Sequence, residues 1–487
     1  MFSIEKQVDI VGGRQVFARA EHSARMTLAE KGGRAIMRVL SKEARVVSVS
    51  AVATGVDVEA SGKLVVSAVC ETHGGEIVCL EYVGNFNFTH KAVGVSVPAS
   101  CDVSAIVSQV RVLRASGCEV AVEVELEILE NFSVAVGEPS VVSAVDCYSS
   151  VRCIPAVSSM LKVHDFVCSG EMEVDGAIET VLSQQFYCEH TGVSYRGDSV
   201  VCSGNIHGWL CYKNIAGEIK RESCSFPYRE EFSCAEAEDY AVFARAGECS
   251  VVCEVNEIKG VSAVTFDVEV EISLWGYQTL QFECGSDFFC DKFQLISEQS
   301  EFVCSQFVGA VQGTAKFSEI CDWPYDLSGD VLVASARVAS VERVESTAKF
   351  GGNLVCCVCS GGKFCELQVP YAVDFPINPD GGNGVCDVCV AEISARISAG
   401  KVEVFGRVCG NLVVTKERRE IVVSSLSIGN PKENVAGGFV LYRAEKGETL
   451  LGVCESVGVM PELLKSQNPN VLFPIPAETK VVVWKQA

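Results

Sequence analysis

Two stretches of this chain alternate apolar and polar residues with a strict period of two. In residues 122–128 the even positions are valine, leucine or isoleucine, and the odd positions are all glutamate. In residues 266–274 the even positions are again apolar, and the odd ones are acidic or serine. Successive side chains of a strand point to opposite sides of the sheet, so this pattern predicts antiparallel strands with one buried and one wet face. A rougher copy of the pattern occurs at 401–409.

These alternating strands close three segments that repeat the same order of features at a period of about 145 residues. Each segment opens with an apolar stretch ending in Val-Leu, then has a glycine turn before a strong strand, and then an apolar-aromatic patch. The Val-Leu pairs lie at 39–40, 181–182 and 331–332, the glycines are Gly62, Gly197 and Gly352, and the patches lie at 86–88, 226–232 and 369–375. The repetition predicts tandem modules of one kind.

We therefore expect a mainly β protein with three tandem β-sandwich-like repeats, each with one short helix near its Val-Leu pair. The expected repeats are 1–145, 160–283 and 300–428. Linkers are expected near 146–163, 284–300 and 428–438, and the last of these is rich in turn formers, which predicts a flexible tether at 429–438. Glu123, Glu125 and Glu127 are interpreted as a solvated face rather than a calcium or paired-carboxylate site.

Residues 439–487 follow a different pattern. A short extended stretch is broken by Gly447, and Thr449 then stands in an N-cap position before apolar residues at helical spacing. Pro461 suits the first turn of a second helix, which Asn468-Pro469 ends. Residues 480–484 are a final β-branched strand. The tail is thus predicted to be a small βααβ domain.

This tail resembles a LysM module, a fold known for binding N-acetylglucosamine polymers and, in some lineages, proteins. In LysM folds the binding groove lies between the first-strand-to-helix loop and the second-helix-to-strand loop. The resemblance therefore implies a groove formed by Gly447, Glu448, Thr449, Leu450, Asn468, Pro469, Asn470, Val471 and Leu472, with Trp484 nearby.

The tail also departs from the common LysM pattern. Glu448 replaces the usual Asp, Cys454 the usual Ala and Val457 the usual aromatic residue, which leaves open whether the ligand is a glycan or a protein. Trp484 could cover the small core or could anchor a partner, since tryptophan is enriched among interface hot spots. Thr449 and Asn468 could serve only as cap and turn.

Three β-rich repeats followed by such a module resemble the SPOCS–LysM proteins of endospore-forming clostridia, over nearly the whole chain. The resemblance implies a non-enzymatic morphogenetic scaffold of the spore coat, made in the mother-cell cytoplasm and gathered at the forespore surface. It also implies that the LysM docks onto the spore coat morphogenetic ATPase (SpoIVA-like), with other coat proteins as further partners. The alternative is a wall protein that binds peptidoglycan glycan, with the repeats acting as spacers.

Composition narrows the possible partners. The formal net charge of −23 argues against nucleic-acid binding, which needs a basic face, and disfavours anionic membranes. No window of about 18 uninterrupted apolar residues occurs, and the first residues lack a basic stretch leading into an apolar one. We therefore expect no membrane insertion and no export by a standard signal.

The 26 cysteines are interpreted mainly as small buried hydrophobes in a reducing compartment. Two alternatives remain. Cys386 and Cys389 have C-x-x-C spacing, with further cysteines upstream at 356, 357, 359 and 365, which would suit zinc if the residues lay on turns. A cysteine-rich surface could also be oxidised late and cross-link an assembly. Because the upstream group has the pattern of a strand, we expect no metal site.

Motifs of catalysis are missing from the sequence. No phosphate-binding glycine loop, zinc-protease helix or nucleophile elbow occurs. Cys188 and His190 are the closest Cys/His pair and are interpreted as structural. We expect no catalytic residues and no cofactor, although an enzyme assembled from distant positions of a repeat remains a third hypothesis.

Overall fold

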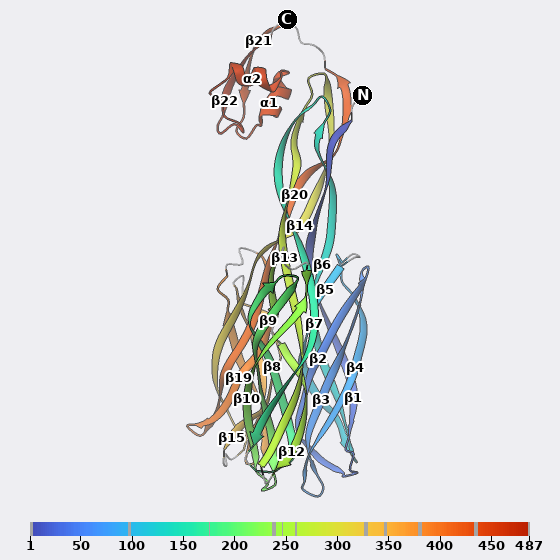
Figure 1. Ribbon diagram of the computed structural model, residues 1–487, viewed down its shortest axis with the longest axis vertical. Coiled ribbons are helices and arrows are strands. Elements are labelled where there is room, and N and C mark those ends of the chain that lie inside the picture. The colour runs from blue at the N-terminus through green and yellow to red at the C-terminus, as the bar shows by residue number, and fades with distance from the viewer. Residues whose placement is uncertain are drawn as a thin grey trace.

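The computed structural model describes residues 3–95, 99–174, 176–235, 240–245, 247–258, 261–325, 330–344, 348–377, 382–432 and 437–485. The chain is almost entirely β-strand. Three sandwiches form a wide head, their longest strands continue upward as a narrow stalk, and a small helical module lies at the tip of the stalk (Figure 1). The expected fold class, three tandem β-sandwiches followed by a βααβ module, is confirmed.

Each sandwich consists of two antiparallel layers with a similar strand order. Unit 1 spans residues 4–144, unit 2 residues 148–289 and unit 3 residues 293–431. In unit 1 one sheet has the order β1-β6-β5 and the other β2-β3-β4. The strands of unit 1 are β1 (Ile4–Ala29), β2 (Ile36–Thr54), β3 (Asp57–Thr72), β4 (Ile77–Lys91), β5 (Ala99–Ser116) and β6 (Glu119–Ala144).

Units 2 and 3 repeat this arrangement. In unit 2, β13 pairs with β7, β11 and β12, and β8-β9-β10 forms the second layer; β12 also pairs with β8, so the two layers are parts of one seven-stranded sheet. Its strands are β7 (Tyr148–Val174), β8 (Ile178–Arg196), β9 (Ser199–Asn214), β10 (Ile219–Ser233), β11 (Ala241–Arg245), β12 (Gly247–Ile258) and β13 (Val261–Phe289). Those of unit 3 are β14 (Phe293–Cys321), β15 (Val331–Val338), β16 (Glu342–Arg343), β17 (Lys349–Ser360), β18 (Lys363–Asp374), β19 (Asn383–Ser398) and β20 (Lys401–Pro431).

The alternating stretches form the sandwich cores as expected. The even residues of 122–128 on β6 and of 266–274 on β13 are buried, and so are Val402 and Val404 on β20. The interpretation of the odd residues as a solvated face is wrong for two of them, since Glu123 and Glu127 are only 9% and 7% exposed. Arginines on the neighbouring strands cover them, with N–O distances of 2.7 Å from Arg25 to Glu123 and 2.6 Å from Arg19 to Glu127.

The short helix expected at each Val-Leu pair is absent, because these pairs lie in strands β2, β8 and β15. In the described residues, α-helices occur only in the C-terminal module. Register shifts follow Val39 on β2 and Val181 on β8, and each inserts one residue into the strand. A bulge of this kind breaks the period of two and gives apolar residues a spacing that resembles that of a helix.

A glycine facing an aromatic residue recurs in each unit, but one of its members differs from the expected one. Gly62 lies opposite Phe86, and Gly352 lies opposite Tyr371. The equivalent in unit 2 is Gly204 opposite Tyr228, whereas Gly197 lies in the β8–β9 turn with φ of 60°. A Cβ on any of the three paired glycines would collide with a backbone oxygen of a neighbouring segment, which is a strand for Gly62 and Gly204 and the β15–β16 connection for Gly352. Glycine is therefore required there, and in units 1 and 2 the ring of Phe86 or Tyr228 covers the bare backbone.

The three units pack around a common axis. The bulged residues Leu40, Leu182 and Ala334 meet there, and they form one apolar cluster with Val69, Cys211, Cys357, Cys359 and Phe364. This cluster is separate from the three sandwich cores. The central strands β3, β9 and β17 are therefore buried on both faces, one in their own sandwich and one against the neighbouring units.

The expected linkers at 146–163 and 284–300 are wrong, since most of both stretches lies in strands of the stalk. Strand β7 starts at Tyr148, and the turns between units are confined to residues 145–147 and 290–292. The units are consequently longer than the expected 160–283 and 300–428. Of the expected tether at 429–438, residues 429–431 end strand β20, and residues 433–436 lie outside the described residues.

The stalk has three arms, one from each unit, in which β1 pairs with β6, β7 with β13 and β14 with β20. Apolar contacts and ion pairs hold these arms together. Ile10 of arm 1, Ile154 and Cys284 of arm 2, and Phe302 and Val422 of arm 3 share one buried cluster. Among the residues that the structure describes, an ion pair also joins each pair of arms. These are Lys6–Glu283 at 2.5 Å, Arg152–Glu420 at 2.7 Å and Arg14–Glu417 at 3.9 Å. Because serine, glycine and exposed charges interrupt the apolar pattern of the arms, their sequence resembles that of linkers.

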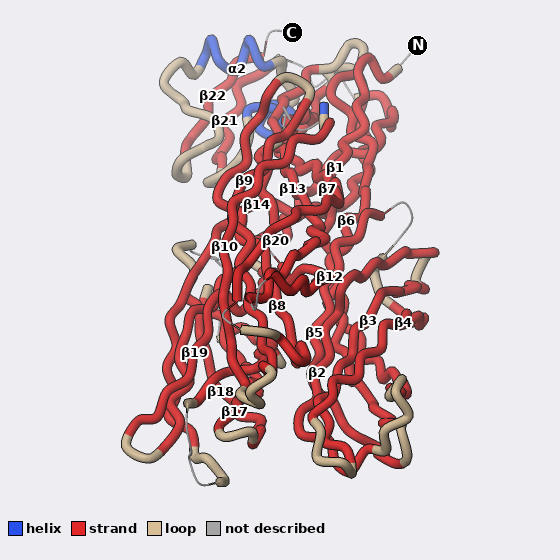
Figure 2. The backbone as a smooth tube through the Cα atoms, turned by 60° about the horizontal axis from the view of Figure 1, so that its bottom comes forward, coloured by secondary structure: helices blue, strands red, loops and turns tan. Residues whose placement is uncertain are grey.

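The C-terminal module consists of β21 (Gly438–Ala444), α1 (Leu450–Val457), α2 (Pro461–Gln467) and β22 (Thr479–Lys485). Thr449 caps α1 by accepting a hydrogen bond from the backbone N–H of Gly452, and Gly458 ends the helix in the left-handed conformation. Pro461 opens α2. Neither helix has the length to cross a membrane, and no described helix does. Figure 2 shows the two helices as the blue segments beside the stalk tip.

Candidate functional site

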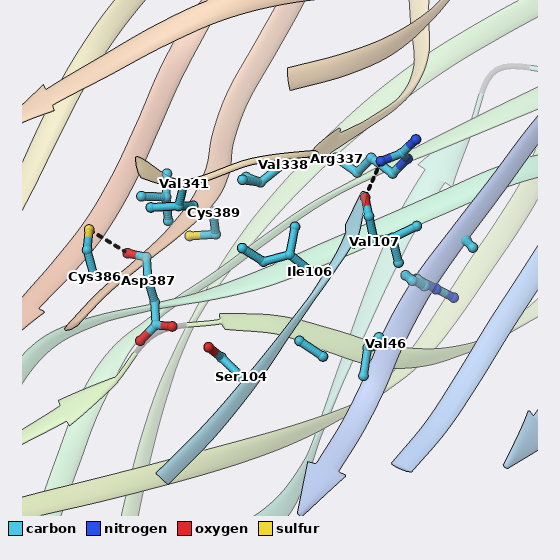
Figure 3. A pocket seen from close by; sticks show the side chains of 14 residues that line it. Val46, Ser104, Ile106, Val107, Arg337, Val338, Val341, Cys386, Asp387 and Cys389 are labelled. Atoms are coloured by element: carbon cyan, nitrogen blue, oxygen red, sulfur yellow. Dashed lines mark hydrogen bonds between the residues drawn. The ribbon is translucent and has the colours of Figure 1, made fainter. Parts of the chain in front are cut away.

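A cavity of about 170 Å³ lies between units 1 and 3 (Figure 3). Its walls come from β2, β5, β15 and β19, and Arg337 of unit 3 donates a hydrogen bond to the carbonyl oxygen of Val107 in unit 1. Cys386 and Cys389 both line it, yet they belong to different apolar clusters, because residues three apart on a strand lie on opposite faces. They therefore do not form a zinc knuckle.

A second cavity, of about 270 Å³, lies between units 1 and 2 and contains Glu43, Arg45 and Glu81. Burial raises the pKa of Glu43, while Arg45 and a hydrogen bond from Ser335 of unit 3 act against that shift. Arg45 also donates a hydrogen bond to the carbonyl oxygen of Gln184 at 3.0 Å. These polar groups form contacts between the units. Both cavities are therefore best explained as gaps in the packing between units.

The Cys188–His190 pair lies inside unit 2. The Tyr228 hydroxyl is hydrogen-bonded to Nδ1 of His190, and both side chains are buried. Burial raises the pKa of the Cys188 thiol to about 12. A protonated thiol in a sandwich core has neither the charge nor the access of a nucleophile.

Most other cysteines resemble Cys188. Cys70, Cys211 and Cys359 are at most 2% exposed, and burial raises the pKa of each to about 12. These thiols occupy positions in sandwich cores and in the axial cluster. Cys153, on the stalk, is exposed.

We expect iodoacetamide at pH 8 to alkylate Cys153 of the folded chain quickly and to leave Cys70, Cys211 and Cys359 unmodified. The thiolate is the nucleophile, and a pKa near 12 leaves only about one thiol in ten thousand deprotonated at that pH. Peptide mapping by mass spectrometry, with a urea-unfolded sample as the control for full reactivity, measures this. Rapid labelling of Cys211 in the folded chain would contradict the assignment of that thiol to the axial cluster.

The first predicted groove loop is fixed by its own hydrogen bonds. The backbone N–H of Gly447 donates to the carbonyl of Ile475 at 2.8 Å, and the N–H of Ile475 donates to the carbonyl of Glu448 at 2.9 Å. The Glu448 carboxylate accepts from the Tyr442 hydroxyl at 2.7 Å. Thr449 caps α1 and also donates a hydrogen bond to Asp287 of the stalk. The polar side chains of this loop therefore already have partners within the chain.

At the start of the second predicted loop, side chains form hydrogen bonds to the backbone of strand β22. Asn468 donates to the Val482 carbonyl at 2.7 Å and accepts from the Val482 N–H at 2.9 Å. Gln467 makes the same pair of bonds to the backbone of Trp484, at 3.0 and 2.6 Å. Val471 packs against the module core, whereas Pro469, Asn470 and Leu472 are exposed. Asn468 is thus a structural residue of this module.

An apolar strip, consisting of Phe439, Leu441, Val482 and Trp484, covers the outer face of the β21–β22 sheet. Phe439 lies opposite Trp484, and Leu441 lies opposite Val482. The exposed fractions are 62% for Phe439, 58% for Trp484, 59% for Leu441 and 36% for Val482. Trp484 therefore does not cover the core. The sequence analysis missed Phe439 and Leu441, although the run Phe439–Tyr442 is apolar on both faces of a short strand, which is the available signal.

The strip faces away from the stalk. Helix α1 contacts strands β13 and β7, and Tyr148 and Phe289 of the stalk tip join the module core. Lys432 contributes an ion pair with Glu455 of α1 and lies 4.4 Å from the centre of the Phe289 ring. Because the helices cover the inner face of the β21–β22 sheet, the strip is on the side opposite to these contacts (Figure 1).

Comparison with known proteins adds no relative to this description. No family model, no curated protein and no solved structure matches the chain.

Proposed function

We propose that this protein is a non-enzymatic scaffold of the endospore coat, whose C-terminal module docks onto another protein. The observation that supports docking best is the apolar strip, because an exposed cluster of aromatic and aliphatic side chains at the end of a stalk is typical of an interaction site. The resemblance to SPOCS–LysM proteins suggests the partner, the coat-anchoring ATPase, and the place, the forespore surface.

The head and stalk suit a structural role. The polar groups of its inter-unit cavities and its buried thiols take part in packing, and the stalk places the module away from the head. Because the docking module lies at the end of the stalk, the surface that binds the partner is separated from the surfaces of the head, which remain available to other coat proteins. The acidic charge of −23 favours partners with basic surfaces.

Glycan binding is the second candidate, because the βααβ order is that of LysM folds. In this chain Glu448 and Asn468 use their side chains within the module, and Thr449 contacts the stalk. A sugar chain entering between the two loops would compete with these bonds. Leu472, which is 72% exposed, is the loop residue best placed to contact such a ligand.

A direct test compares two binding partners for the full chain. We expect purified chain to bind recombinant coat-anchoring ATPase in a titration followed by light scattering or calorimetry, and not to co-sediment with purified peptidoglycan. A fluorescent fusion should gather at the forespore, and a fusion without residues 438–487 should stay dispersed. Co-sedimentation with peptidoglycan and no binding to the ATPase would reverse the order of the two candidates.

A further inference from the structure

The two edges of the β21–β22 sheet are treated differently by the chain. The outward edge of β22 is sealed, because Gln467 and Asn468 bond to the N–H and C=O groups of Trp484 and Val482. In an antiparallel pair, residues whose backbone groups point outward lie opposite residues that also point outward. The N–H and C=O groups of Phe439 and Leu441, the partners of Trp484 and Val482, therefore point to the other edge, that of β21.

Nothing in the described part of the chain pairs with that edge, since β21 has β22 as its one strand neighbour there. Natural proteins usually block or charge such edges, because an open strand accepts strands from other chains. Here the open edge borders the apolar strip instead.

We propose that the outer edge of β21 accepts an extended segment of the partner protein as a third strand. The proposal rests on the proposed function, that the module docks onto a protein, and adds how it does so. Backbone bonds to Phe439, Leu441 and Arg443 would hold the segment, and its alternate side chains would extend the apolar strip. One occupant, an extended apolar segment, would both cover the exposed apolar surface and form hydrogen bonds with the unpaired backbone groups at this edge.

The charged residues at one end of the strip indicate which residue type the partner segment carries there. Arg443 and Lys480 form a cross-strand pair on the same face as the strip. Glu478 pairs with Arg443, whereas Lys480 has no ion pair among the described residues. An acidic residue near that end of the segment would complement Lys480. The same reasoning disfavours a second copy of the chain as occupant, since both copies would carry a charge of −23.

The test compares Leu441→Pro with Leu441→Ala in the full chain, using the recombinant coat-anchoring ATPase as the probe. Both variants lose the leucine side chain, but proline also removes the outward N–H, which makes no bond to β22. We expect Leu441→Pro to bind about tenfold more weakly than Leu441→Ala, which corresponds to about one backbone hydrogen bond. Thermal unfolding of both variants checks that the module stays folded.

Hydrogen exchange of the wild-type complex provides a second measurement that needs no variant. We expect the amides of Phe439, Leu441 and Arg443 to be protected when the ATPase binds, with no change at Val482 and Trp484, whose amides already have partners.

Equal binding of the proline and alanine variants, or no added protection at β21, would overturn the edge proposal and leave docking intact. Absence of any binding by the wild type would overturn docking, and the edge proposal with it. A dimer of the free chain that Leu441→Pro dissociates would assign the edge to self-association instead.

Discussion

The Trp484→Ala variant is expected to bind the proposed partner, the coat-anchoring ATPase, with a free energy weaker by about 2 kcal/mol or more, a loss of about thirtyfold in affinity. The indole is 58% exposed at one end of the apolar strip and lies opposite Phe439. Large aromatic side chains that become buried on binding commonly carry most of an interface's energy. Because the side chain contributes little to the module core, the free energy of unfolding should change by less than about 0.5 kcal/mol.

Two other exposed residues serve as controls for this variant. Leu472→Ala removes an apolar side chain from the predicted groove, and Ile215→Ala removes one from the head, where it is 73% exposed. Both should bind the ATPase as the wild type does. A strong effect of Leu472→Ala with none for Trp484→Ala would place the contact in the groove, and wild-type affinity in all three variants would exclude the strip from the interface. Isothermal calorimetry with the full-length variants measures all three.

The sandwich cores could be predicted from sequence because their physics is local. A strand such as β6 has one apolar side in the sandwich core and one charged side, so Val122, Val124 and Leu126 alternate with glutamates in a pattern that few other structures produce. The C-terminal module was predictable for a similar reason. Thr449 and Gly458 are cap residues whose roles depend on a few neighbouring residues.

The assembly of the units was not predictable from the same patterns. The central strands pack on both faces, so Val65, Val69 and Cys357 stand at positions where a free sandwich would be polar. The runs 64–70 and 354–359 do show this loss of alternation, which is the signal of a strand buried on both sides. The strands of the stalk were not predicted from sequence for the opposite reason. Each arm is partly exposed, and the residues that it contacts belong to the two other units.

The candidate site was predicted only in part. Thr449 and Asn468 lie where the LysM resemblance places them, but their side chains bond within the chain. The exposed strip arises from pairing between two strands separated by about forty residues, and no local pattern states which face of such a pair the helices cover. Trp484 could be assigned to the outside only after the helices were placed.

The Leu182→Asp variant is expected to lose at least about 4 kcal/mol in its free energy of unfolding, because it places a charge without a partner in a dry cluster. Leu182 is 1% exposed and lies on the common axis with Val69, Cys211, Ala334 and Cys357. Since this cluster is separate from the sandwich cores, the charge should separate the units before it unfolds them. Small-angle scattering should then show a larger radius of gyration with circular dichroism nearly unchanged.

Two further aspartate substitutions serve as controls that distinguish separation of the units from ordinary unfolding. Leu210→Asp places the charge in the core of unit 2, where Leu210 is fully buried, and should remove the sheet signal of that unit. Thr191→Asp places it at an exposed position of β8, the strand that also carries Leu182, and should change stability by less than about 0.5 kcal/mol. If Leu182→Asp behaved like Thr191→Asp, the axial cluster would contribute little, and the three sandwiches would be held together chiefly by the stalk.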